Sequence, residues 1–135
     1  MTLVVCVDDD FGMLFNGRRQ SKDRLLRKDL LQTTKGSRLW MNNYSASQFE
    51  EAERIIVDEN FLERTGCNDY CFVENMDITP YILHVTGVIV YRWNRDYPAD
   101  TFFPVALFKD RWKLCSREEF TGSSHDVITK EVYVL

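Results

Sequence analysis

Short apolar runs divide the chain into strand-length segments separated by polar connections. The first run, Leu3 to Val7, is continuous and rich in β-branched residues, which predicts a strand covered on both faces within a mostly parallel sheet. Further strands are expected at 38–41, 54–57, 70–73 and 88–93. The last third differs, because 112–120 and 127–135 read as two strands joined by a turn at 121–124. These two strands predict a C-terminal antiparallel hairpin.

The main helix is expected from Lys22 to Thr34, where helix-forming residues follow Ser21, a candidate N-cap. Within this helix, Asp23 lies three and seven residues before Leu26 and Leu30. The carboxylate of Asp23 should therefore share the apolar stripe that faces the core. A simpler explanation is an acid favoured by the dipole at a helix start.

Two shorter helical segments are expected further along, and one polar stretch is expected to be a loop. A capping box at Ser45 or Ser47 predicts a short helix reaching about Glu53. A helical turn is expected near 77–83, and the stretch 8–20 is predicted to be a long surface loop. The complete pattern predicts an α/β fold with a mixed, mostly parallel sheet and two to three flanking helices.

Composition narrows the class of protein. The chain has 135 residues with 44% apolar residues, enough for one core, so a single domain over 1–135 is expected. A net charge of −4 argues against a general attraction to nucleic acid. We find no run of eighteen apolar residues and no leader pattern. Four cysteines without a C-x-x-C pair indicate reduced thiols and a cytoplasmic location.

One segment is basic in an otherwise acidic protein. Its six cations fall within eleven residues: Arg18, Arg19, Lys22, Arg24, Arg27 and Lys28. Such a cluster is usually a solvated helix face, and the alternative is a site for a phosphate or carboxylate group.

Both ends of the chain carry familiar motifs. Val4 to Asp8, followed by Gly12-Met13 and Asn16, resembles the opening of dihydrofolate reductases, in which a strand leads into a G-[IM]-x-x-N loop. The segment Asp100-Thr101-Phe102-Phe103-Pro104 resembles the G-D-T-x-F-P segment of that family. Trp112, Ser124-His125 and 131–133 fall where the family places its final hairpin. The resemblance implies a dihydrofolate reductase-like fold.

The resemblance also implies a ligand site. The family's pterin-binding carboxylate lies on the first helix, and Asp23 stands eleven residues after Gly12, which matches that position. We therefore expect Asp23, Asn16, Arg19 and Ser45 to line a cleft for a pterin-like or phosphate-bearing small molecule.

Two departures concern the nicotinamide cofactor. The family's M-G-[RK]-x-T motif, which binds cofactor phosphate, is replaced by Met41-Asn42-Asn43-Tyr44-Ser45. The family also has a strand ending in Gly-Gly and a helix where this chain passes from Leu83 to Gly87, and Gly-Gly occurs nowhere here. We therefore expect a shortened, divergent relative without a cofactor and without reductase activity. Its remaining strands should re-pair, and an edge exposed by the deletion could form a homodimer.

Two further constellations suggest enzymatic chemistry. Asp8 and Asp10 follow the first strand and are candidates for a Mg²⁺ site, although a solvated loop also explains them. Short proteins that resemble this one are sometimes labelled ribonuclease Z, yet that enzyme needs a histidine cluster and this chain has only His84 and His125. The neighbours Ser124-His125-Asp126 point to opposite faces of a strand and cannot form a triad by themselves.

Three functions therefore remain open from the sequence. The first is a small-molecule binding module without reductase activity. The second is a Mg²⁺-dependent hydrolase or ribonuclease-like enzyme, and the third is a non-catalytic interaction protein.

Overall fold

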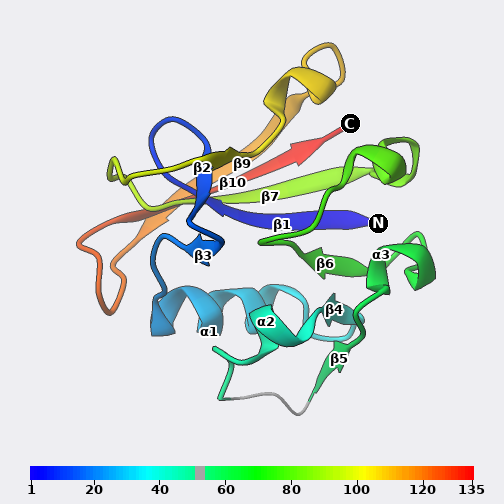
Figure 1. The fold of residues 1–135 in the computed structure, drawn as a ribbon, viewed down its shortest axis with the longest axis horizontal. Coiled ribbons are helices and arrows are strands. Elements are labelled where there is room, and N and C mark those ends of the chain that lie inside the picture. Colours follow the sequence, from blue (N-terminus) through cyan, green and yellow to red (C-terminus); the bar gives the residue numbers. More distant parts are fainter. Residues whose placement is uncertain (51–53) are drawn as a thin grey trace.

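A seven-stranded sheet forms the centre of the protein (Figure 1). The computed structural model describes residues 1–50 and 54–135. In sheet order, the strands are β5 (Ile55–Val57), β4 (Leu39–Met41), β6 (Tyr70–Phe72), β1 (Thr2–Val7), β7 (Gly87–Arg92), β10 (Ile128–Val134) and β9 (Lys113–Phe120). The five strands from β5 to β7 run parallel to one another. Strand β10 runs antiparallel to both β7 and β9, so the predicted mixed sheet and C-terminal hairpin are confirmed.

Strand β1 is covered on both faces, as its continuous apolar run predicts. On one face, Val4 packs in a cluster with Leu26 and Leu30 of helix α1 (Arg24–Thr33). On the other face, Val5 packs with Phe61 of helix α3 (Phe61–Arg64) and Phe108 of the 3₁₀ helix η3 (Val105–Phe108). The sheet therefore lies between two layers, with α1 along one side (Figure 1).

A second, small sheet replaces the loop predicted at 8–20. It contains β2 (Gly12–Phe15), β3 (Arg18–Arg19) and β8 (Thr101–Phe102) in the order β3-β2-β8. Asn16 and Gly17 form the turn between β2 and β3 with φ of 52° and 72°, the conformation that an Asn-Gly hairpin turn requires. The loop prediction was wrong because these strands are too short to show an alternating pattern.

Helix starts also differ from the predictions. Helix α1 begins at Arg24 and is capped by Asp23 rather than Ser21. Helix α2 (Asn43–Ala46) is capped by Asn42, earlier than either predicted capping box. The predicted helix end at Glu53 lies outside the described residues.

Among the shorter helices, the 3₁₀ helix η2 (Thr79–His84) agrees with the predicted helical turn. Helix α3 and the helix η3 were not predicted, because four residues are too few to establish a helical period.

The chain contributes no strand between Leu83 and Gly87, and the sheet is nevertheless continuous from β5 to β9. These two strands are its edges, and the predicted homodimer stays a prediction. In the described ranges, no helix has the length and apolar character needed to cross a membrane.

Leu30→Ala should destabilise the protein by about 2–5 kcal/mol, because Leu30 is fully buried between α1 and the sheet and truncation leaves a cavity. Urea unfolding followed by circular dichroism measures this change. Gln32→Ala, at an exposed position of the same helix, is the control and should shift the free energy of unfolding by less than about 0.5 kcal/mol. Equal effects of the two substitutions would contradict the packing described here.

Candidate functional site

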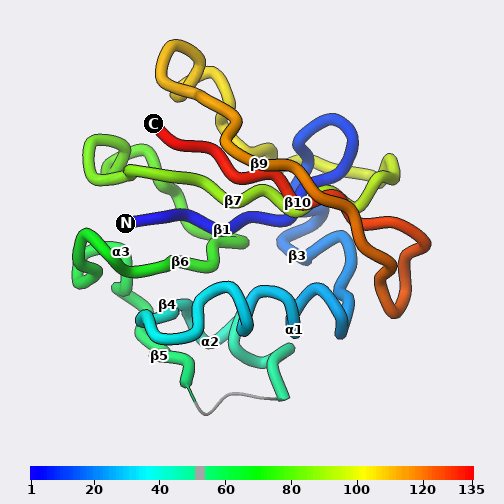
Figure 2. The backbone as a smooth tube through the Cα atoms, turned by 180° about the vertical axis from the view of Figure 1, so that it is seen from behind, coloured from blue at the N-terminus to red at the C-terminus, as the bar shows by residue number. Residues whose placement is uncertain are grey.

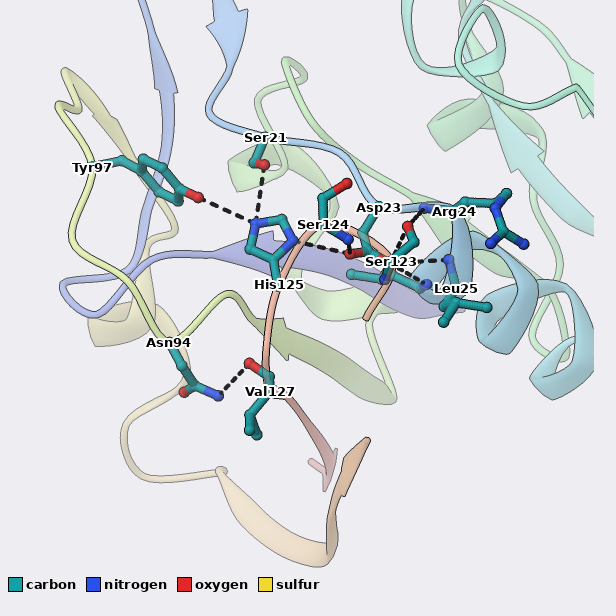
Figure 3. Close-up of polar contacts among 11 residues, drawn as sticks. Ser21, Asp23, Arg24, Leu25, Asn94, Tyr97, Ser123, Ser124, His125 and Val127 are labelled. Carbon is teal, nitrogen blue, oxygen red and sulfur yellow. Dashed lines mark hydrogen bonds and ion pairs between the residues drawn. The ribbon is translucent and has the colours of Figure 1, made fainter. Parts of the chain in front are cut away.

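The carboxylate of Asp23 is the most heavily bonded group in the described structure. Its Oδ1 accepts hydrogen bonds from the backbone N–H groups of Leu25 and Leu26, at 2.9 and 3.1 Å, and so caps α1. The same oxygen accepts from the N–H of Ser123 at 3.0 Å and from its hydroxyl at 3.2 Å. Oδ2 accepts from the N–H of Ser124 at 2.8 Å and contacts Nδ1 of His125 at 3.0 Å (Figure 3).

These contacts fasten the connection between β9 and β10 onto the start of α1, two regions that approach one another in Figure 2. We call Asp23, Ser123, Ser124 and His125 the Asp23 clamp. Gly122 allows the close approach, because a Cβ there would lie 2.4 Å from Oδ2 of Asp23 and 2.8 Å from Ile128. Any larger residue at this position would push the loop away from the carboxylate.

Asp23 is held in its ionised form. Burial by itself would raise the pKa of Asp23, but the hydrogen bonds from His125 and from the backbone of Ser123, Ser124 and Leu26 outweigh burial. The pKa of Asp23 therefore lies well below its ordinary value. A carboxylate that accepts this many hydrogen bonds has no oxygen lone pair directed toward an outside ligand.

His125 is fixed on all sides. Its side chain is 2% exposed, and its ring stacks on Trp93 with 4.5 Å between the ring centroids. Because ionised Asp23 can only accept, Nδ1 of His125 must carry the proton in that contact. In the neutral ring, Nε2 is then the acceptor, and it faces the hydroxyls of Ser21 at 3.1 Å and Tyr97 at 3.2 Å.

Ser21, His125 and Asp23 thus form a hydroxyl–imidazole–carboxylate chain (Figure 3). Sequence spacing excludes a triad within Ser124-His125-Asp126 and gives no indication of this one. Its histidine lies about a hundred residues from the other two members, and no local signal could connect them. The only sequence hint was the inward position predicted for Asp23.

Of these three residues, only Ser21 lines the neighbouring surface cavity. The cavity has a volume of about 580 Å³ and lies between β3, the start of α1 and α2. We call it the basic cavity, and six residues line it: Arg18, Arg19, Ser21, Lys22, Tyr44 and Ser124. Three of the six cations of the basic segment therefore gather around Ser21.

Arg19 and Ser45, two of the predicted ligand residues, meet at a carboxylate that the sequence analysis missed. Glu74, which is 8% exposed just after β6, accepts two hydrogen bonds from the Arg19 guanidinium, at 2.9 and 3.1 Å. It also accepts from the hydroxyl of Ser45 at 2.8 Å and from Gln48 at 3.2 Å. These polar groups are therefore bound to one another.

Asn16 lies apart from the other predicted ligand residues. It is exposed in the turn between β2 and β3, and its N–H donates to Asp100 at 3.0 Å. The structure therefore brings Arg19 and Ser45 together, places Asp23 in its own clamp, and leaves Asn16 at a hairpin tip.

The candidate metal residues Asp8 and Asp10 lie near Asp96, whose pKa is raised first of all by the charge of Asp10. The carboxylate of Asp8 is buried and accepts from the N–H groups of Asp10, Gly12 and Tyr97 and from the Gln20 amide. Among the residues that the structure describes, no three His, Cys, Asp or Glu side chains are grouped so as to hold a metal ion. Asp8 instead fixes the connection between β1 and β2.

No protein-family model matches the chain, and no curated protein matches its sequence. Among solved structures, it is similar to a dihydrofolate reductase from Enterococcus faecalis complexed with NADP(H) and RAB-propyl. The TM-score is 0.66 at 9% sequence identity, over 98% of this chain and 94% of the other. The dihydrofolate reductase-like fold is thereby confirmed. The shortened chain and the ribonuclease Z label gain no support and stay predictions.

The start of α2 does not fit a cofactor phosphate, although helix N-termini commonly bind phosphate groups. Two of its N–H groups already have partners, because the Asn42 side chain accepts from the N–H of Ser45 at 3.1 Å and Glu59 accepts from the N–H of Asn43 at 2.8 Å. Glu59 would also repel a phosphate at this position.

Asp23→Asn should lower the free energy of unfolding by about 3 kcal/mol at pH 7, because an amide offers one acceptor and turns a donor toward the clustered N–H groups. The contribution of Asp23 is present above its unfolded-state pKa of about 3.9 and is lost as the pH falls through its lower folded value. The difference between wild type and variant should therefore shrink below about pH 4.

Urea unfolding between pH 2.5 and 7 measures this difference. Asp77→Asn is the matched control, because Asp77 is an exposed acid that caps only its own turn. A stability difference for Asp23→Asn that stays constant with pH would contradict an ionised clamp.

Proposed function

We propose that the protein binds a small molecule carrying a phosphate or carboxylate group in the basic cavity, and that it has no reductase activity. The observation that supports this proposal most strongly is that Arg18, Arg19 and Lys22 line one cavity in a protein whose net charge is −4. A concentrated positive patch on an acidic protein attracts anions to that place.

The cavity combines one fixed cation with two exposed ones. Arg19 is held by Glu74 and lies over the Tyr44 ring, with 4.2 Å from the guanidinium carbon to the ring centroid. Arg18 and Lys22 are exposed, and within the described ranges neither forms an ion pair. Exposed cations beside a preorganised wall can approach an anion without first breaking a salt bridge.

The hydroxyls of Ser21, Tyr44 and Ser124 provide neutral hydrogen-bonding groups in the same cavity. They would orient a ligand whose charge is held by Arg18 and Lys22. A pterin would find both oxygens of Asp23 already engaged, since each accepts hydrogen bonds within the protein. The occupied start of α2 supports the absence of reductase activity, because a pyridine dinucleotide needs its phosphates bound.

A thermal-shift series tests the proposal with inorganic pyrophosphate and adenosine 5′-monophosphate as phosphate probes, citrate as a carboxylate probe, and folate and NADPH for comparison. At a ligand concentration about one hundred times Kd, binding should stabilise the protein by about 2.7 kcal/mol. That corresponds to a rise of several degrees in Tm. The double variant R18A/K22A should lose most of the shift.

The matched control K35A/K109A removes two exposed positive charges outside the cavity and should keep the shift. No shift with any anionic probe, or the same shift in both double variants, would refute anion binding in the basic cavity. Oxidation of NADPH in the presence of dihydrofolate would refute the absence of reductase activity.

A further inference from the structure

We propose that Ser21, His125 and Asp23 form a serine hydrolase site, and that its substrate is a carboxylic ester bearing an anionic group. The inference rests on the proposed function for the class of substrate, because the basic cavity would hold the anionic group. The assignment of the nucleophile rests on separate observations at the three side chains.

Each contact in the chain has the geometry that nucleophilic catalysis requires. Ser21 Oγ is 3.1 Å from Nε2 of His125, within reach for transfer of its proton. Nδ1 of the same ring lies 3.0 Å from Oδ2 of Asp23, which fixes the tautomer and stabilises the imidazolium that forms. Asp23 acts through His125 and is a positioning residue.

The imidazole of His125 and the carboxylate of Asp23 are shielded from water. The side chains of His125 and Asp23 are 2% and 0% exposed, while Ser21 is half-buried and lines the basic cavity. The nucleophile therefore faces the substrate space, and the base lies behind it among Trp93 and the clamp. In a water-excluded setting, the Asp23 charge acts more strongly on the ring.

Cys6 does not compete as the nucleophile. Burial, reinforced by the nearby charge of Glu74, raises the pKa of the Cys6 thiol well above its ordinary value and keeps it protonated. Tyr97 does share Nε2 with Ser21, at 3.2 Å, but it is not among the residues that line the basic cavity.

The reaction balances without a redox partner. Ser21 Oγ forms a bond to the ester carbonyl carbon, its proton passes to Nε2 of His125, and the carbon–oxygen bond to the leaving alcohol breaks as that alcohol takes the proton. Water then attacks the acyl-serine and gives its proton to Nε2, which returns one to Ser21 Oγ as the carboxylic acid leaves. Arg18 and Lys22 would hold the anionic group of the acyl chain.

Labelling by a fluorophosphonate probe tests the nucleophile in the full chain, with intact mass and peptide mapping as readouts. We expect a single adduct on Ser21 in wild type and no adduct in Ser21→Ala. Ser116→Ala, at an exposed position on β9, should be labelled like wild type. An adduct on Tyr97, or none at Ser21 in a protein with an unchanged melting curve, would overturn the proposal.

A second variant tests whether His125 activates the side chain at position 21. Ser21→Cys keeps a nucleophile next to His125, and iodoacetamide should alkylate position 21 at least about tenfold faster than the exposed Cys67 and Cys115. Equal alkylation rates would show that His125 does not activate the group at this position.

Hydrolysis of mono-4-nitrophenyl succinate and of neutral 4-nitrophenyl acetate tests the class of substrate. Ser21→Ala should lower kcat/KM for the succinate ester about a hundredfold or more. The R18A/K22A variant should raise KM for the succinate ester only. A Ser21 adduct without this selective change would overturn the anionic substrate class, whereas anion binding without a Ser21 adduct would overturn the hydrolase and leave the proposed function standing.

Discussion

One buried carboxylate joins the two ends of this fold. Asp23 caps α1 and holds a loop about one hundred residues further along the chain. Because a buried donor without an acceptor costs roughly 1–3 kcal/mol, the backbone N–H groups around Asp23 would each become a defect without it. The requirement for a carboxylate in turn dictates Gly122, since only that residue lets the loop approach Oδ2 so closely.

The number of hydrogen bonds that Asp23 accepts within the protein also limits which ligands this fold can bind. A carboxylate that accepts from five different residues cannot also recognise an outside amidine. Glu74 has a parallel effect, because it engages Arg19 and Ser45. Two interior polar sites are therefore filled by the protein's own groups, and the exposed cations Arg18 and Lys22 line the basic cavity.

The sheet could be predicted from the sequence because most of its strands coincide with short apolar runs. Strand β1 and the C-terminal hairpin were found in this way, and motifs at both ends led to the correct fold at 9% identity. The small sheet was missed because β3 has only two residues. Asp23 was placed correctly as an inward-facing acid, but its partners His125 and Ser123 depend on tertiary contacts that leave no spacing signal.

The stability of the fold accounts for the Asp23 carboxylate, but it does not account for both hydroxyls that contact His125. The Asp23 clamp needs Nδ1 of His125, and a ring held by Trp93 and Asp23 is already fixed. One donor would satisfy Nε2, yet two hydroxyls face it. Tyr97 alone would satisfy Nε2, so the fold does not need the second contact, from Ser21, which also lines the cavity where the cations gather. The second hydroxyl is therefore the feature that distinguishes a reactive serine from a structural contact.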